Sequence, residues 1–296
     1  MASLATHFTA FLLLFPTGLR RLLSSSSLYF SNPSIFRSRP WFFPSVPKSH
    51  AFDLYFLLVA LPISSFSMFF LFLTFSGPSA SRFAFFQQSF TVFLFWILLL
   101  FILLREHVQL SAINEGHVFV LLGIAFLVES SFTGRGISDI GVTGAVYGLL
   151  GKLTLLCALS CIYLGLNPTA FWAEFVLSCG LIFKGMWSLQ AGLSLGTDAF
   201  APKGCEKLGV VAGQGIVSMK CDVQEDGLRG VALMNLLFVG HAVLVLSVGL
   251  VLFGVSSSCG EGSRSGDASG PLLARLETET APVRQIHELE LELELE

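Results

Sequence analysis

The sequence predicts an all-α fold, a polytopic membrane helix bundle with seven transmembrane helices. Hydrophobic residues make up 53% of the 296 residues and charged residues only 12%, whereas a soluble domain has about 25% charged residues. The apolar residues come in blocks, and about 20 of them cross the roughly 30 Å hydrocarbon core as a helix. In lipid the backbone must satisfy its own hydrogen bonds, so these blocks are expected to be helical.

Six blocks are long enough to be predicted as membrane spans. Three of them carry no Asp, Glu, Lys or Arg: Leu54–Phe75, Phe83–Leu104 and Val231–Val255, which has His241 as its only titratable group. The other three contain charged residues: Gly116–Phe132, Gly141–Leu164 and Thr169–Leu195. Of these, Gly116–Phe132 is short and has Glu129 near its end.

A seventh, shorter segment, Ala5–Leu19, is interrupted by Pro16. A secretory signal peptide has its basic residues before the apolar core. Here Arg20 and Arg21 follow the core and no basic residue precedes it. We therefore expect a retained first helix, which brings the count to seven.

The basic residues predict how the chain crosses the membrane. Cytoplasmic loops are enriched in Lys and Arg, and the densest basic cluster follows the first helix: Arg20, Arg21, Arg37, Arg39 and Lys48. This places the N-terminus outside and, with seven spans, the C-terminus in the cytosol of an endomembrane or plasma-membrane protein. The loop Gly196–Arg229 runs against this orientation, because four basic residues would lie outside: Lys203, Lys207, Lys220 and Arg229.

Two segments are predicted to lie outside the helices. The loop Ser24–His50 is rich in Ser, Pro and aromatic residues, and amphipathic aromatic side chains favour the headgroup region, so we expect it on the inner leaflet. Residues 256–296, which end in HELELELELE, are predicted to be a disordered acidic cytosolic tail, because blocks of like charge stay disordered. Residues 1–255 then form the transmembrane domain.

Lys184 is the most informative charged residue, because it lies near the middle of a predicted span. At 100° per residue it shares a helix face with Leu177 and with the small residues Gly180, Ser188 and Ala191, which allow another helix to approach. A charge at this depth costs about 2.5–3.5 kcal/mol on insertion scales, so it must face protein or water. Glu129, on a parallel helix, lies at the same estimated depth of roughly 20 Å, which predicts a Glu129–Lys184 ion pair.

The intramembrane polar group is predicted to contain Glu129, Lys184, Lys152 slightly lower, and His241 as a further candidate. Its role is left open by the residues, since the pair either only fixes the register of the helices or acts in function, as intramembrane charges often do. Lys184→Met separates these alternatives: a structural role predicts lost folding or abundance, and a transport role predicts normal abundance with lost flux.

Two further features concern contacts between segments. Cys205 and Cys221 flank the middle of the loop predicted to lie outside, where oxidation is permitted, so we expect them to form a disulfide. Gly144 and Gly148 form a small-xxx-small motif, which serves either internal helix packing, the interpretation we favour, or a homo-oligomer.

The sequence contains none of the motifs that indicate catalysis, metal binding or nucleic-acid binding. Nucleophile-elbow, P-loop, zinc and HExxH patterns are absent, as is a sustained basic tract. We therefore expect no catalytic, cofactor-binding or metal-binding residues and no nucleic-acid partner.

Several blocks of the chain resemble a known family: RFAFFQQSFTVFLFW, GIAFLVE, NPTAFWAEF, FKGMWSLQAGLSLGTDAFAPKGC and EDGLRGVALMNLLFVGHA. They are similar, in order over roughly residues 1–255, to the plant viral-response-like family, which is related to the animal transmembrane protein forty-five group of seven-helix membrane proteins. The resemblance implies a multi-pass plant membrane protein without an established active site. This chain departs from the expected pattern at Met186 and Gly196, and it lacks the histidines that the animal relatives have around helices 4 and 5.

Together these features favour a non-enzymatic membrane protein that binds lipids or membrane-protein partners, linked through the resemblance to plant stress or viral response. The alternative is a small-solute or ion transporter that uses the intramembrane Glu/Lys group. An intramembrane enzyme is a third class, which nothing specific in the sequence supports.

Overall fold

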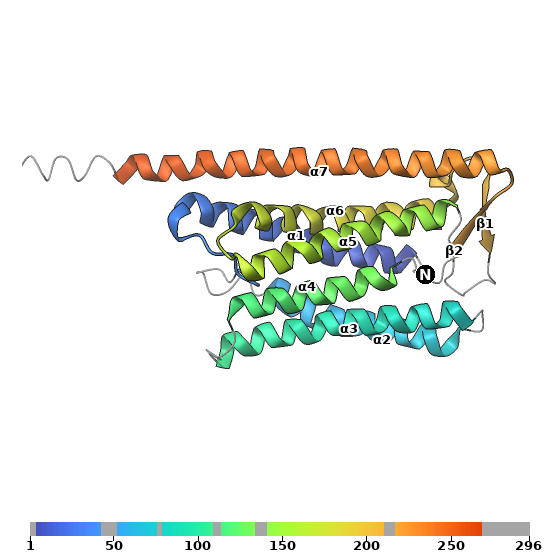
Figure 1. Cartoon of the computed structure of the whole chain (residues 1–296), viewed down its shortest axis with the longest axis horizontal. Helices are drawn as coiled ribbons and strands as arrows, with labels where there is room; N and C mark the ends of the chain where they lie inside the picture. The colour runs from blue at the N-terminus through green and yellow to red at the C-terminus, as the bar shows by residue number, and fades with distance from the viewer. Residues whose placement is uncertain are drawn as a thin grey trace, which may run out of the picture.

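Seven α-helices lie side by side with their axes close to one direction (Figure 1). The structure is a computed structural model that describes residues 4–42, 52–75, 79–108, 114–133, 141–209 and 217–267. The helices are α1 (Leu4–Ser31), α2 (Phe52–Thr74), α3 (Ser79–Val108), α4 (Glu115–Phe132), α5 (Val142–Leu166), α6 (Phe171–Gly196) and α7 (Gln224–Asp267). Two 3₁₀ turns, η1 (Pro33–Ile35) and η2 (Asp198–Phe200), and two strands, β1 (Cys205–Gly209) and β2 (Val217–Cys221), complete the described elements.

Six of the described helices, α2 to α7, are long and apolar enough to cross a membrane. They correspond to the six apolar blocks that the sequence predicts. Helix α1 does not qualify by the same measure, although it is 28 residues long, because its second half contains arginine and a run of serine. The chain is thus built as a multi-pass membrane protein.

Helix α6 is the centre of the bundle, since 18 of its 26 residues are buried. Helix α1 runs antiparallel to it along nearly its full length. A Cβ atom at Gly185 would lie 2.9 Å from the Phe15 backbone nitrogen, and one at Gly192 would lie 2.7 Å from His7 Cβ. Small residues at these positions let the two backbones approach closely, which holds α1 inside the bundle rather than at its edge.

The structure corrects the prediction for the N-terminal segment. Helix α1 passes through Pro16 without a break and continues to Ser31, so residues 24–31 are not part of a loop. Neighbouring helices can compensate for the hydrogen bond that a proline removes. Aromatic packing holds the end of α1, because the Tyr29 ring stacks on Phe171 at 4.2 Å between ring centroids and Phe36 is buried against Phe171.

Helices α2 and α3 form an antiparallel hairpin at one side of the bundle (Figure 1). The Ser65 and Ser89 hydroxyls each donate to the other residue's carbonyl, at 2.9 and 2.8 Å. Trp96 Nε1 donates to Leu58 O at 3.0 Å. These bonds link the two helices through the side chains of Ser65, Ser89 and Trp96.

The fold is not purely helical, because β1 and β2 pair as an antiparallel hairpin between α6 and α7. The sequence predicted only a loop here. The hairpin lies at the same end of the bundle as the N-terminus (Figure 1). Helix α7 also differs from the prediction, since it continues to Asp267 and projects beyond the other helices at the far end (Figure 1). The acidic end of the tail lies outside the described residues.

Candidate functional site within the helix bundle

Lys184 and Glu129 meet between α6 and α4, so the predicted ion pair is present. The Lys184 ammonium donates a hydrogen bond to Glu129 Oε2. Only 3% of the lysine is exposed, compared with 26% of Glu129. The ammonium also lies 5.0 Å from the centroid of the Phe126 ring, one helical turn before Glu129. Its charge is therefore matched by a carboxylate and an aromatic face, both from α4.

The face of α6 that carries Lys184 is buried, as predicted from the helical period. Leu177, Gly180, Ser188 and Ala191 are all buried. A Cβ atom at Gly180 would lie 3.0 Å from Cys157 Sγ of α5, so the absence of a side chain there lets α5 approach. The missing side chain at Gly180 lets α5 pack against α6, and α4, which packs on α5, then holds Glu129 within reach of Lys184.

Lys152 does not join this pair, which corrects the prediction. Its neighbour Gly151 faces the end of α4, where a Cβ atom would lie 3.8 Å from Thr133 O. The next residue is rotated by 100°, so Lys152 points away from the bundle and is exposed.

His241 also lies apart from the pair. Its Nδ1 is 2.8 Å from Leu237 O within α7, and its ring packs edge-on against Trp187, with centroids 6.0 Å apart. The described contacts of His241 are thus with the α6–α7 interface rather than with Glu129.

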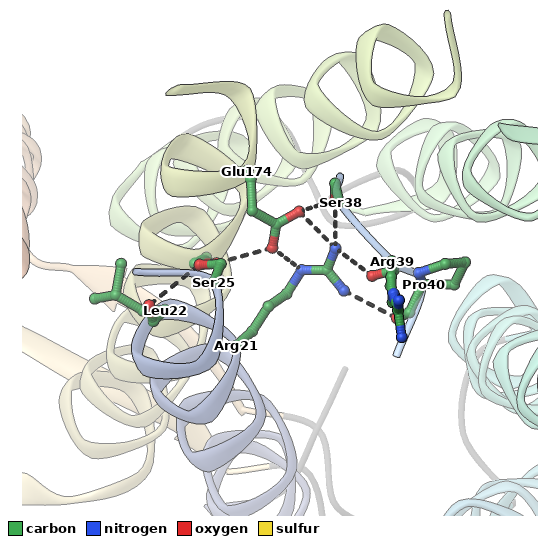
Figure 2. Close-up of polar contacts among 8 residues, drawn as sticks. Arg21, Leu22, Ser25, Ser38, Arg39, Pro40 and Glu174 are labelled. Carbon is green, nitrogen blue, oxygen red and sulfur yellow. Dashed lines mark hydrogen bonds and ion pairs between the residues drawn. The ribbon is translucent and has the colours of Figure 1, made fainter. Parts of the chain in front are cut away.

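A second buried ion pair, between Arg21 of α1 and Glu174 of α6, was not predicted (Figure 2). Arg21 Nε lies 2.5 Å from Glu174 Oε1, and Nη2 donates to Oε2 at 2.7 Å. Glu174 is fully buried and Arg21 is 8% exposed. Of these two contacts only the one from Nη2 is a hydrogen bond, and the Nε contact is a close approach of opposite charges.

The segment after α1 completes the surroundings of Arg21 (Figure 2). Arg21 donates to Pro40 O at 2.9 Å and to Arg39 O at 3.1 Å. The Ser38 hydroxyl donates to Glu174 Oε2. The pair therefore ties residues 38–40 to the start of α6.

The sequence contained a signal for this pair that was not used. Glu174 lies only about 6–8 Å from the inner edge of its predicted span, and Arg21 was predicted at the same membrane face. The contact was missed because the first helix was expected to end at Leu19, which would have left Arg21 in a loop. The continuous helix to Ser31 points Arg21 inward instead.

A cavity of about 350 Å³ lies between α1, the α2–α3 hairpin, α4 and α6. Most of its lining is apolar, with Leu14, Phe95, Leu122 and Leu181 among the residues. Polar groups line it along its length: His7, Gln87, Gln88, Thr91, Glu129, Tyr147, Lys184 and Arg21. The cavity thus offers a mainly apolar surface with a few fixed polar groups, as small-molecule sites do.

His7 marks the end of this cavity near the N-terminus. It is buried, and its Nε2 lies 3.0 Å from the Tyr147 hydroxyl of α5. Arg21 marks the other end, about 21 Å away along α1 by the helical rise. Lys184 lies between these two positions, because Gly185 packs on Phe15.

Cys205 and Cys221 are bonded as a disulfide, as predicted. They are paired residues at the base of the β-hairpin. The backbone of Met219 in β2 donates to the Thr143 hydroxyl of α5 at 3.2 Å, so the hairpin is attached to the start of α5.

In the part of the chain that the structure describes, no group of three or more His, Cys, Asp or Glu residues could hold a metal ion. The remaining described cysteines, Cys157, Cys161 and Cys179, are buried and unbonded to one another.

Comparison with protein families gives a match over part of the chain. Residues 115–254 match DUF716, a family of unknown function. The match covers α4, α5, α6, the hairpin and most of α7, and so includes Glu129, Glu174 and Lys184 but not α1. None of the curated proteins matches the chain.

Proposed function

We propose that this multi-pass membrane protein binds a single-chain amphipathic molecule, such as a fatty acid or a lysophospholipid, in the cavity beside α1. The observation that carries the proposal is the 350 Å³ cavity, lined mainly by apolar side chains, into which Lys184 and Glu129 face. Small-molecule pockets have volumes of about 300–1,000 Å³ and a small number of placed polar groups. The role is binding rather than catalysis.

The acidic and basic groups explain why the ligand would be amphipathic rather than a pure hydrocarbon. Lys184 and Glu129 supply a donor and an acceptor at the same point of the cavity wall. A ligand with a polar head satisfies these groups while its chain contacts Leu14, Phe95 and Leu122. Charged hydrogen bonds contribute about 1.5–3 kcal/mol each, enough to orient the molecule.

The proposal includes seven membrane spans, with α1 as the additional one. Leu4 packs against Gly196 and Gly18 against Ile182, so α1 runs through the same layer as α6. The disulfide supports an oxidising compartment at the end that holds the N-terminus and the hairpin. Arg21, Arg37 and Arg39 lie at the opposite end, which supports a cytosolic face there.

Photo-crosslinking tests the site. The purified full-length chain is incubated with diazirine-labelled oleate or lysophosphatidylcholine in nanodiscs and irradiated, and the labelled residues are mapped by mass spectrometry. We expect labels on Leu14, Phe95 and Leu122. Leu181→Trp should reduce them, because it fills the cavity while Lys184 and Glu129 are both retained. Leu159→Trp is the matched control, since Leu159 is exposed on α5.

The paired variant tests the polar groups. Lys184→Met alone leaves Glu129 unpaired, so the variant Glu129→Gln/Lys184→Met is used beside it to keep both groups neutral. We expect at least about tenfold weaker retention of oleate, corresponding to one charged hydrogen bond, in a variant that still elutes as a folded species. Labels confined to lipid-facing residues, or equal labelling in Leu181→Trp and Leu159→Trp, would refute a cavity site.

Transport is the second candidate, and a specific observation favours it. Polar groups line the cavity from His7 near one end, through Lys184, to Arg21 near the other. Flux of a solute or of protons into proteoliposomes that is lost in Glu129→Gln/Lys184→Met would support transport. Ligand binding without flux would support the binding role alone.

The resemblance to the plant viral-response-like family suggests a setting in stress or viral response. This setting stays a prediction that rests on the resemblance. Comparing viral accumulation in plant cells with and without the chain, and with Leu181→Trp, would link it to the cavity.

A further inference from the structure

A second charged site lies on the outer surface of α5. Six residues on this surface are all exposed: Gly148, Lys152, Leu155, Leu156, Leu159 and Tyr163. By the 100° period they fall within about 60° of Lys152. We call this surface the Lys152 face. It is a continuous apolar strip with one cation at its centre.

The cation lies at mid-membrane depth. Gly151 packs beside Ser130 and Thr133 at the end of α4, in the same turn as Glu129. Lys152 is therefore level with the Glu129–Lys184 pair. It lies roughly 15 Å from the Val142 end of α5 and roughly 21 Å from the Leu166 end, counted at 1.5 Å per residue.

Among the described residues, no carboxylate forms an ion pair with Lys152. Of the acids described in the buried ion pairs, Glu129 lies at this depth and is already paired with Lys184, and Glu174, nearer the end of its helix, is paired with Arg21. A lysine that faces lipid at this depth is costly, and such residues commonly meet an opposite charge or water. An acid from another molecule would remove the cost.

The adjacent glycine indicates how a partner would approach. A Cβ atom at Gly148 would meet nothing within 4 Å, so the α5 backbone is open one turn from Lys152. Small residues in this position allow a helix to pack closely. The exposed leucines on the other side extend the contact along α5.

A second copy of this chain does not fit the charge. In a two-fold dimer the same patch contacts itself, so Lys152 would face another Lys152. The mid-membrane acids described on the partner copy would be paired within that copy. Charge complementarity therefore points to a different protein.

We propose that the Lys152 face binds a transmembrane helix of another membrane protein that carries an Asp or Glu at mid-membrane. The contact consists of an ion pair between that carboxylate and Lys152, with the partner's backbone packed over Gly148. It is independent of the cavity, because Lys152 does not line the cavity.

A designed probe tests the proposal. The full chain is labelled with a donor dye and reconstituted in phosphatidylcholine vesicles with an acceptor-labelled polyleucine transmembrane peptide that has one central Glu. Matched peptides have Leu or Lys at that position. We expect energy transfer to the Glu peptide at an affinity about tenfold higher for the wild type than for Lys152→Leu, the scale of an interhelical polar contact.

Charge reversal gives the decisive comparison. The Lys152→Glu variant should no longer bind the peptide with a central Glu and should bind the peptide with a central Lys instead. A lysine moved to α7, in Lys152→Leu/Val239→Lys, is the control, because Val239 is exposed at the level of Trp187, which the neighbouring Phe238 contacts. It should not restore binding. Size-exclusion profiles confirm that each variant is folded.

Two results would overturn the proposal. Equal affinity of wild type and Lys152→Leu for the Glu peptide would show that Lys152 is satisfied otherwise, by lipid phosphate or by its own chain. Full restoration by Val239→Lys would show that any exposed lysine suffices and that the Lys152 face has no role.

Discussion

Removing the guanidinium of Arg21 should destabilise the bundle more than removing that of the adjacent Arg20. Arg21→Met leaves the Glu174 carboxylate fully buried with only the Ser38 and Ser178 hydroxyls as described partners. Breaking a buried ion pair in this way costs about 3–5 kcal/mol. Arg20→Met removes the same chemical group one residue earlier, where it donates to Phe42 O at 3.0 Å and is only partly buried. We expect about 1 kcal/mol for that loss.

The double variant Arg21→Met/Glu174→Met separates the pair from its surroundings. Replacing both members of a buried pair with apolar residues is often close to neutral. We therefore expect the double variant to be more stable than either single variant, even though Ser38 and the carbonyls of Arg39 and Pro40 lose a partner. The coupling free energy should be at least about 2 kcal/mol, within the range of contacting residues.

The assay is reversible unfolding in mixed micelles of dodecylmaltoside and dodecyl sulfate, followed by circular dichroism and tryptophan fluorescence. Free energies of unfolding are compared for the wild type, the three single variants and the double variant. Additive single effects, or equal losses in Arg20→Met and Arg21→Met, would refute the reasoning that α1 is locked to α6 by an ion pair.

Three further substitutions test the packing and the hairpin in the same assay. Gly185→Ala should lower the free energy of unfolding by about 1–3 kcal/mol through overpacking, because its Cβ would lie 2.9 Å from the Phe15 nitrogen. Gly148→Ala should instead raise it by up to about 1 kcal/mol through helix propensity. A loss of stability at both positions would contradict the assigned faces. Cys205→Ser should cost about 2–4 kcal/mol, typical of a disulfide, and should leave Cys221 open to alkylation by maleimide on intact vesicles. An unchanged gel mobility and a full maleimide reaction in the unreduced wild type would contradict the bond.

Much of the helix bundle was predictable because a helix that crosses the membrane needs a block of about 20 apolar residues, and such blocks can be read from the sequence. The six predicted spans coincide with α2 to α7 within a few residues, except at the ends of α7. The Glu129–Lys184 contact was predictable for a related reason. Few opposite charges are available at the depth of each of these residues, and the helical rise gives that depth from the residue count alone.

The parts that sequence reasoning missed depend on contacts rather than on hydropathy. The extension of α1 to Ser31 is supported by Tyr29 stacking on Phe171, and no local signal shows that partner. The direction of Lys152 depends on Gly151 facing α4. The sequence does not show which face of α5 packs on α4, so this direction could not be predicted. The hairpin follows from strand pairing between β1 and β2, in a loop whose composition is ambiguous.

The polarity of α1 explains why the polar groups collect where they do. A helix with arginines and a run of serine is costly against lipid, so α1 is placed beside α6, the most buried helix. His7 then meets Tyr147 and Arg21 meets Glu174, which satisfies α1 at both ends. Between these ends the α2–α3 hairpin covers α1 without filling the space, and the cavity forms there. Replacing all the polar residues of α1 by apolar ones would remove the cost of exposing α1 to lipid. The cavity and the polar pairs should then be lost together rather than one by one.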